Sequence, residues 1–355
     1  MLIRLADICD IEKGQQIDTD KLEPSKPYKY INGGIKESGY FDEYNTIGNT
    51  ITVSEGGASC GYVNYVCEPF WCGCHCYRLT NHNVDSRYLY YALKANEQKI
   101  MDLRTGVAMP NIRKSSFENL VIKICESESE QQKVVLTLDK ITSLIKKSEH
   151  ELLLLDSIIK SRFIELFGNV IDNEKGWNTY KLNEVCDVRD GTHDSPKYVS
   201  NGYPFVTSKN ITNGELDFSN VQYISKADYL HFEDRSHVDD GDILMPMIGT
   251  VGGAVIVKKD RDFSIKNVCL IKFSRTDMVL NIYIKYVLNS DEMNLYFDSL
   301  KKGGNQPFIG LNTIRNLQIP IPTMDKQKEF STFVDSVDKL KFINGNKKEP
   351  TTHHF

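Results

Sequence analysis

The 355-residue chain lacks any run of about 18 consecutive apolar residues, so no membrane-spanning helix is expected. Residues 1–10 also lack the basic and then apolar pattern of a secretory signal peptide. Nine cysteines in a chain of this length are too sparse for a disulfide scaffold, and free thiols are expected. These absences together predict a cytoplasmic protein.

The chain has no excess of basic residues, because its formal net charge is −5. A nucleic-acid-binding protein that acts alone is usually basic, so the net charge argues weakly against DNA. Local basic patches or a basic partner can still supply the attraction. The apolar content of 40% and charged content of 26% are ordinary for a globular protein, and the length suits two domains with connecting elements.

The sequence contains an internal repeat. Residues 106–120 recur at 303–317, with an offset of 197 residues, no gap, and Gly, Pro, Ile, Asn and Leu in register. Residues 5–14 similarly match residues 182–191. A period of this size is far longer than that of solenoids or propellers, so it indicates a duplicated domain. Both copies are rich in β-branched and aromatic residues interrupted by Gly and Asn-Gly, which predicts an α+β fold of two similar domains.

A long helix is predicted between the two copies, from about residue 130 to 167. Its apolar residues follow alternating steps of four and three, the pattern of a coiled-coil seam, and 38 residues would span roughly 57 Å. The apolar seam members are Val134, Leu138, Ile141, Ile145, Leu152, Leu155, Ile159 and Leu166. A helix of about 18 residues from near Asp325 repeats the spacing with Phe330, Val334 and Val337, until Lys341 interrupts it. The alternative for the first helix is a long helix buried inside one domain.

These patterns divide the chain into five parts. We expect recognition domains at 1–125 and 169–323, a spacer helix at 126–168, a short second spacer helix at 324–345, and a polar, disordered tail at 346–355.

The ordered set of motifs resembles the specificity subunit of type I restriction–modification systems. A Gly-x-x-x-Pro-x-Ile loop precedes each helix, Glu130-Gln131-Gln132 opens the first, and residues 319–322 (Ile-Pro-Ile-Pro) are followed by Gln327 before the second. Residues 190–198, 202–206 and 209–211 are similar to a sequence that recurs at the start of target-recognition domains in that family. The departure from the family is the short second helix.

The resemblance implies a non-catalytic subunit whose two domains each read one half of a split double-stranded DNA site. The helices would act as spacer and as docking surface for two methyltransferase (modification) subunits, with a restriction motor subunit as a further partner. No cofactor is expected in this chain, because S-adenosylmethionine would bind the partner methyltransferase. Two alternatives remain: a specificity subunit of a fused nuclease–methyltransferase or solitary methylation system, and a duplicated protein-interaction scaffold that binds no DNA.

Candidate DNA-binding residues lie in the loops, where Lys and Arg can hold phosphates and amides can read base edges. The segment 299–315 contains no acidic residue, which is unusual in an acidic chain, although it could also be a solvated turn with incidental charge. His193 could equally be a turn residue. The candidates are Lys29, Tyr30, Lys36, Arg104, Arg113 and Lys114 in the first copy, and His193, Lys197, Lys209, Asn210, Lys301, Lys302, Asn305 and Gln306 in the second.

Other chemistries fit the sequence less well. Residues 70–79 are predicted to form one strand with Cys72, Cys74 and Cys76 on one face, which is not the paired spacing of a structural zinc site. Asp85 with Glu97 and Lys99 matches a nuclease pattern only loosely, since the latter two fall on a predicted helix. No Asn-Pro-Pro or Asp-Pro-Pro motif of an amino-methyltransferase occurs, and no metal site is expected.

Overall fold

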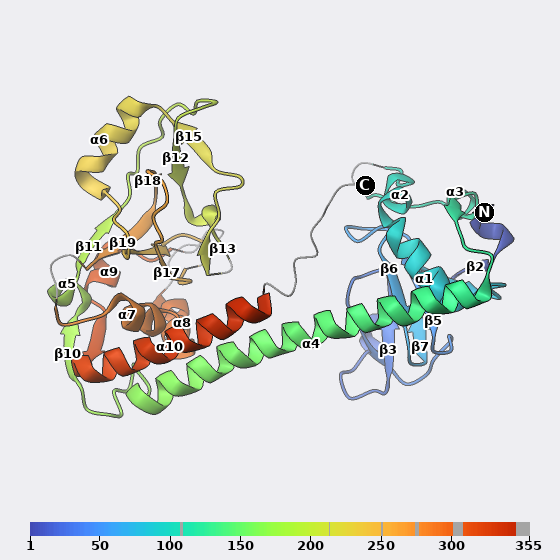
Figure 1. Cartoon of the computed structure of the whole chain (residues 1–355), viewed down its shortest axis with the longest axis horizontal. Helices are drawn as coiled ribbons and strands as arrows, with labels where there is room; N and C mark the ends of the chain where they lie inside the picture. The colour runs from blue at the N-terminus through green and yellow to red at the C-terminus, as the bar shows by residue number, and fades with distance from the viewer. Residues whose placement is uncertain (107–108, 213, 250, 274–276, 301–307, 346–355) are drawn as a thin grey trace. The chain divides into compact units, whose positions relative to one another are not determined.

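The computed structural model describes residues 1–106, 109–212, 214–249, 251–273, 277–300 and 308–345. The chain divides into two compact units, one from Met1 to Lys147 (unit 1) and one from Ser148 onward (unit 2). Figure 1 labels the elements of both. None of the helices described there is long and apolar enough to cross a membrane.

Among its described residues, unit 1 contains three small sheets, three short α-helices, and the 3-10 helices Leu5–Asp7 and Thr19–Lys21. A four-stranded antiparallel sheet has the order β2-β8-β5-β6, a three-stranded sheet has the order β4-β3-β7 with β3 and β7 parallel, and β1 pairs with β9. The strands are β1 (Leu2–Arg4), β2 (Asp10–Lys13), β3 (Tyr28–Ile31), β4 (Gly39–Phe41), β5 (Thr50–Ser54), β6 (Val63–Val66), β7 (Phe70–Cys72), β8 (Cys76–Thr80) and β9 (Val121–Lys123). The helices are α1 (Ser86–Ala95), α2 (Glu97–Asp102) and α3 (Lys114–Glu118).

Unit 2 repeats this topology strand for strand. Its sheets have the orders β11-β19-β16-β17, β15-β12-β18 with β12 and β18 parallel, and β10-β20, and it adds the hairpin β13-β14. The strands are β10 (Asn178–Lys181), β11 (Asp187–Asp190), β12 (Tyr203–Val206), β13 (Ile211–Thr212), β14 (Glu215–Leu216), β15 (Gln222–Ile224), β16 (Ile243–Pro246), β17 (Val255–Ile256), β18 (Ser264–Ile265), β19 (Val268–Lys272) and β20 (Gln318–Ile321). Its helices include α5 (Leu182–Val185), α6 (Lys226–Ser236), α7 (Asn281–Leu288), α8 (Asp291–Leu300) and α9 (Leu311–Arg315). The prediction of an α+β fold with two similar units is confirmed.

Two longer helices follow the two copies. Helix α4 (Glu128–Phe167) has 40 residues and α10 (Met324–Gly345) has 22. Within unit 2 the C-terminal part of α4 and α10 lie side by side (Figure 1). Arg162 pairs with Glu329 at 2.5 Å, and Asp156 pairs with Lys341 at 2.7 Å. Residue numbers rise along one helix as they fall along the other, so the pair is antiparallel.

An aromatic cluster holds this antiparallel pair together. The ring of Phe163 lies 5.4 Å from Phe330 and 6.0 Å from Tyr283 of α7, and Phe167 lies 4.9 Å from Tyr283. All four rings belong to the core of unit 2 and are at most 4% exposed. Each buried aromatic contributes on the order of 2–3 kcal/mol by removal from water, so this cluster fixes how α4 enters unit 2.

The predicted seam is buried at one end of α4 and uncovered at the other. Ile159 and Leu166 are buried, as are Phe330, Val334 and Val337 of α10, whereas Leu152 and Leu155 are half-buried. In unit 1, Val134, Ile141 and Ile145 are 39%, 46% and 44% exposed, and Leu138 is half-buried. Among the described residues, therefore, the fully buried members of the α4 seam, Ile159 and Leu166, both lie near its C-terminal end.

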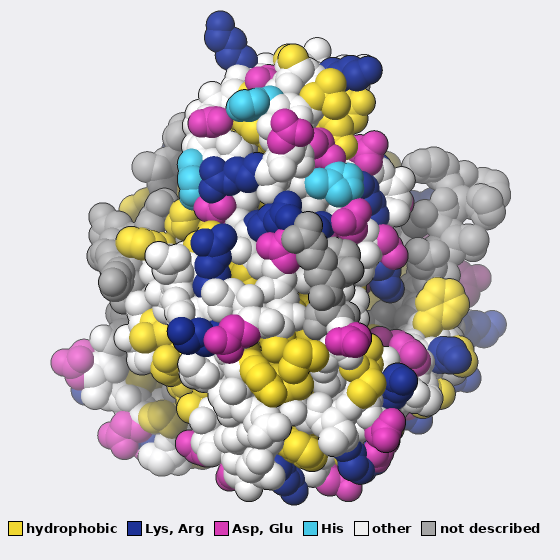
Figure 2. All heavy atoms as spheres, turned by 90° about the vertical axis from the view of Figure 1, so that its left-hand side faces the viewer, with side chains coloured by type: hydrophobic (Ala, Val, Ile, Leu, Met, Phe, Trp, Pro, Cys, Tyr) yellow, Lys and Arg dark blue, Asp and Glu magenta, His cyan; other side chains and the backbone are white. Residues whose placement is uncertain are grey.

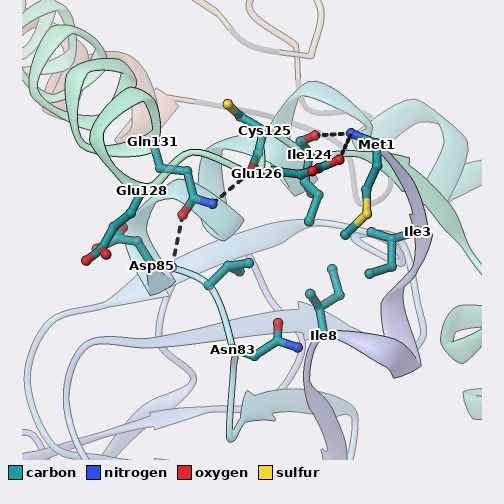
Figure 3. A pocket seen from close by; sticks show the side chains of 11 residues that line it. Met1, Ile3, Ile8, Asn83, Asp85, Ile124, Cys125, Glu126, Glu128 and Gln131 are labelled. Atoms are coloured by element: carbon teal, nitrogen blue, oxygen red, sulfur yellow. Dashed lines mark hydrogen bonds and ion pairs between the residues drawn. The ribbon is translucent and has the colours of Figure 1, made fainter.

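A buried glutamine near the start of each long helix attaches that helix to its unit. In unit 1, Gln131 Nε2 donates to the Cys125 carbonyl at 2.8 Å and Oε1 accepts from the Asp85 amide at 3.3 Å, beside a hollow of about 580 Å³ (Figure 3). In unit 2, Gln327 Oε1 accepts from the Leu280 amide at 2.8 Å, and Nε2 donates to the carbonyls of Pro322 and Met278. The repeated glutamine thus makes the same kind of contact in both copies.

The single strand predicted over residues 70–79 is wrong. The chain forms β7, turns at Gly73–His75, and returns as β8, because β7 pairs in parallel with β3 of one sheet and β8 pairs with β2 and β5 of another. Cys72 and Cys76 are buried together with Ile31, but Cys74 lies on the turn and donates to Gln16 Oε1. Burial also raises the pKa of the Cys9 and Cys186 thiols to about 12, so both stay protonated at neutral pH.

Candidate nucleic-acid interface

The repeated Gly-x-x-x-Pro-x-Ile loop of unit 1 is held against the β5–β6 turn. The Ile112 amide donates to the Glu55 carbonyl at 2.8 Å, and the Gly57 amide donates to the Pro110 carbonyl at 3.0 Å. The Glu55 carboxylate also accepts a hydrogen bond from the Lys13 ammonium at 2.6 Å. The Glu55 amide donates to the carbonyl of His75 on the β7–β8 turn at 2.9 Å. Glu55 therefore joins three loops that are far apart in the sequence.

Unit 2 holds the described end of its copy, Phe308 and Ile309, in a corresponding way. The Ile309 amide donates to the Met247 carbonyl at 2.9 Å, and Phe308 forms a bridge with Ile248 at the start of the β16–β17 connection. These partners occupy the positions that Ile112, Glu55 and Gly56 occupy in unit 1, since β16 and β17 correspond to β5 and β6. In both units, the amide of the last residue of the repeated motif, Ile112 or Ile309, donates to a carbonyl at the end of β5 or β16. We call this hydrogen bond the brace, because it holds the end of the repeat loop against the turn of the four-stranded sheet.

Two adjoining hollows open beside this brace in unit 2. One, of about 610 Å³, is lined by Ser208 and Lys209 after β12, by the β13–β14 hairpin, and by Ile248, Gly249, Gly252 and Gly253. The other, of about 580 Å³, is lined by the side chains of Tyr198, Asn220 and Gln222 together with Lys266 and Asn267 of the β18–β19 turn. Ser208, Lys209 and Ile248 line both. Amide, ammonium and aromatic groups are the side chains that read base edges and contact nucleic acid.

The structure brings some predicted residues together and not others. Lys209 and Asn210 border the same hollow as Tyr198, the neighbour of Lys197. Among the described residues, Lys36, Arg113, Lys197 and Lys209 are exposed cations for which no ion pair is found. Lys29 lies 3.5 Å from Glu68, Lys114 lies 3.5 Å from Glu118, and Arg104 donates to the Met101 carbonyl.

Two predicted contact residues are buried. Asn210 is 7% exposed, and its side chain accepts from the Thr207 amide and donates to the Asp217 carbonyl, so it organises the turn after β12. Tyr30 is 1% exposed, and its hydroxyl lies 3.4 Å from Gln16 Oε1. Their burial indicates that both support the loops from within. Lys301, Lys302, Asn305 and Gln306 lie outside the described residues.

His193 is 61% exposed at its side chain but held on both ring nitrogens. Nε2 lies 2.8 Å from Asp190 Oδ2, and Nδ1 lies 2.7 Å from Asn267 Oδ1. Asp190 is itself buried and is also bound by Arg235 at 2.5 Å. These contacts fix the orientation of the His193 imidazole at the surface of the loop that follows β11.

A second buried charge cluster stabilises unit 2 behind these loops. The Lys272 ammonium lies 2.7 Å from Asp242 and 2.8 Å from Asp239, and both Lys272 and Asp242 are buried. The hydrogen bond from Lys272 lowers the pKa of Asp239. Burial opposes the charge on Lys272, but its two carboxylate partners raise its pKa overall.

The surface charge is finely mixed. Figure 2 shows Lys and Arg side chains interspersed with Asp and Glu over the face it presents, so no broad area of one sign occurs among the described residues of that face. An acidic chain with local cations therefore attracts phosphates, if at all, at particular loops and not over a whole face.

Sequence reasoning missed the β7–β8 and β18–β19 turns. Lys266 and Asn267 are not among the predicted contact residues, although they line one of the hollows. The signal that could have located them is Asn267 itself, since Asn is the non-glycine residue that most readily adopts positive φ, and its φ is 53°. Two residues of the loose nuclease pattern have structural roles. Asp85 caps α1 by accepting from the Tyr88 amide, and Glu97 accepts from the Val63 amide.

The chain matches known proteins over nearly its whole length. The family model for the type I restriction modification DNA specificity domain matches residues 1–154 and 174–350. The chain is 33% identical over 184 residues to a candidate type I specificity subunit of Mycoplasma pneumoniae, a match that spans 51% of this chain and 48% of that protein. It is 24% identical over 287 residues to a type I restriction enzyme specificity subunit of Methanocaldococcus jannaschii, spanning 76% and 67%. The chain thus spans about half the length of the Mycoplasma pneumoniae relative.

Solved structures share the fold. The S subunit of a type I restriction–modification system from Mycoplasma genitalium superposes with a TM-score of 0.62 at 20% identity, over 98% of this chain and 91% of that one. A chain from a study of complex assembly and conformational transition of the type I system gives 0.53 at 14% identity, over 98% and 93%. At these identities the likeness concerns the fold alone. The match of the family model to both halves shows that this chain belongs to the family of type I restriction modification DNA specificity domains.

Proposed function

We propose that this chain selects the DNA site of a type I restriction–modification complex, each unit reading one half of a split sequence. The observation that carries the proposal is that one loop framework is built twice, with the same strand order and the same brace, while the side chains on it differ. A duplicated frame with different surface groups suits recognition of two different short sequences. In this proposal the chain performs no catalysis, and S-adenosylmethionine and the methyl transfer belong to the partner.

Lys36 and Arg113 in unit 1, and Lys197 and Lys209 in unit 2, are the cations we assign to phosphates. All four are exposed: Arg113 directly follows the braced Ile112, Lys209 lines both hollows, Lys197 precedes Tyr198 of one hollow, and Lys36 lies in the β3–β4 loop. Each phosphate contact removes a condensed counterion, so affinity should fall steeply as salt rises. For the four assigned cations, a DNA mobility shift should weaken on the order of 100-fold between 50 and 200 mM salt. A salt-independent shift, or none with the partner present, would favour the scaffold alternative.

The uncovered seam of α4 is the surface we assign to the methyltransferase subunits. Val134, Ile141 and Ile145 form an apolar stripe at helical spacing, and burying such a stripe is the usual reason for two helices to associate. Replacing Ile141 with Ser should weaken co-purification of the methyltransferase, whereas replacing the exposed Lys140 with Ser should not. Equal binding by both variants would exclude this stripe as the docking surface.

The decisive experiment is methylome sequencing of a host with and without this chain, alongside its methyltransferase. The expected result is a split motif with methylated adenine on each strand, which disappears when the chain is deleted. An unchanged methylome would overturn the proposal. Whether a motor subunit also binds is tested by adding each candidate subunit to the purified complex and measuring its mass.

A further inference from the structure

The loop that follows the first strand of the four-stranded sheet crosses the end of β7 at very short range in unit 1. The Gly14 amide donates to the Cys76 carbonyl at 3.0 Å, and the Gln15 amide donates to the Cys72 carbonyl at 2.8 Å. A Cβ atom at Gly14 would lie 2.2 Å from the Gly73 carbonyl oxygen and 2.4 Å from that of Cys72. No side chain fits there, so glycine is what permits the crossing.

Unit 2 contains the same crossing. The Gly191 amide donates to the Val268 carbonyl at 2.9 Å, and the Thr192 amide donates to the Ile265 carbonyl at 3.0 Å. A Cβ atom at Gly191 would lie 2.4 Å from the Ile265 carbonyl oxygen. Both units therefore have the same two backbone hydrogen bonds and a glycine whose position has no room for a Cβ atom. Gly14 and Gly191 are thus equivalent positions.

This close approach of the loop to the end of β7 or β18 is called the crossing. It places the side chain of the second residue after the glycine next to the β7–β8 turn in unit 1 and the β18–β19 turn in unit 2. In unit 1 the Cys74 thiol donates to Gln16 Oε1 at 2.8 Å. In unit 2 His193 Nδ1 lies 2.7 Å from Asn267 Oδ1, and Lys266 Nζ donates to Ser195 Oγ at 2.7 Å. The same two backbone positions therefore place their side chains together in both units.

The side chains at these positions differ, although the two backbone hydrogen bonds of the crossing are the same. The turn has three residues in unit 1 (Gly73–His75) and two in unit 2 (Lys266–Asn267), and the extra residue, His75, is exposed. In unit 2 both turn residues line the hollow that Tyr198, Asn220 and Gln222 share. An invariant frame that carries variable polar groups at the edge of an open hollow has the properties of a specificity position.

We propose that these crossings determine part of the base sequence each unit accepts, through His193, Lys266 and Asn267 in unit 2 and through Gln16 and His75 in unit 1. This inference rests on the proposed function and deepens it. The ammonium of Lys266 and the amide of Asn267 are donors that suit the N7 and O6 acceptors of purines in the major groove. His193, fixed between Asp190 and Asn267, positions that amide.

The test uses the full chain with its methyltransferase, after the wild-type motif has been determined. Asn267→Gly removes the amide without straining the turn, because glycine readily adopts the φ of 53° found there. Asn49→Gly in unit 1 is the matched control, since Asn49 is exposed and has a φ of 57°. Methylation rates are measured on DNA carrying the cognate site and each single-base variant of it.

The expected result for Asn267→Gly is a loss of discrimination of roughly 5- to 150-fold at one or two adjacent positions of a single half-site. The other half-site should be read as before, and Asn49→Gly should change nothing. His193→Gln, a second variant, should alter discrimination at the same positions. An unchanged preference, or loss of methylation on every sequence by both variants, would overturn the inference. A wild-type complex that directs no split motif would overturn the proposed function as well.

Discussion

Replacing Gln327 with Leu should destabilise unit 2 by about 2–4 kcal/mol. Gln327 is 0% exposed and joins the first turn of α10 to the loop before α7 and the end of β20. Leucine preserves the volume but cannot bond the Leu280 amide or the Pro322 carbonyl, and each buried group left without a partner costs about 1–3 kcal/mol. Gln131→Leu should cost less, about 1 kcal/mol, since one of its two hydrogen bonds is 3.3 Å long and only partly buried.

The assay is urea unfolding followed by tryptophan fluorescence. The chain has two tryptophans, one in each unit, so a Trp71→Phe background leaves Trp177 as the reporter of unit 2. The control is Lys328→Leu, at an exposed residue next to Gln327 in unit 2, whose effect should stay within about 0.5 kcal/mol. Gln131→Leu is followed in a Trp177→Phe background, in which Trp71 reports unit 1. A Gln327→Leu effect no larger than that of the control, with equal dependence on urea, would refute the reasoning.

Three further predictions concern packing, backbone and charge. Phe163→Ala should cost about 3–5 kcal/mol in the same assay, whereas Ile164→Ala, at a side chain 53% exposed, should cost less than about 1 kcal/mol; similar values would show that the aromatic cluster does not hold α4. Gly191→Ala should destabilise unit 2 by about 1–3 kcal/mol because its Cβ overlaps a carbonyl, and Gly310→Ala, which meets nothing within 4 Å, should be neutral in circular-dichroism melting. The folded-state pKa of Asp239 lies below its unfolded value, so its contribution to stability is present above about pH 4 and is lost as the pH falls through the folded pKa. Lys272→Met should therefore weaken the decrease in the unfolding free energy of unit 2 as the pH falls below about 4, measured by urea unfolding at several pH values. An unchanged pH dependence would contradict the assignment.

Much of the architecture follows from local patterns in the sequence. The seam spacing of residues 134–166 specifies α4 because an apolar stripe at helical period stabilises only a helix. The offset of 197 residues aligns Ile112 with Ile309, and the amides of both isoleucines make the corresponding backbone hydrogen bond. Gly14 and Gly191 also match in the sequence. The reason that each must be glycine is its close approach to a carbonyl of a strand distant in sequence, and only the structure shows this approach.

The sequence alone determined that the chain is duplicated, that it is α+β, and that a long helix follows the first copy while a shorter one follows the second; the structure gives them 40 and 22 residues. Those properties depend on periodicity and identity along the chain. Only the tertiary structure decided that residues 70–79 break into two strands of different sheets, that Asn210 and Tyr30 are buried, and that His193 meets Asn267. Each of these depends on contacts between residues distant in sequence, whose pairing is set by the packing of whole sheets and not by local preference.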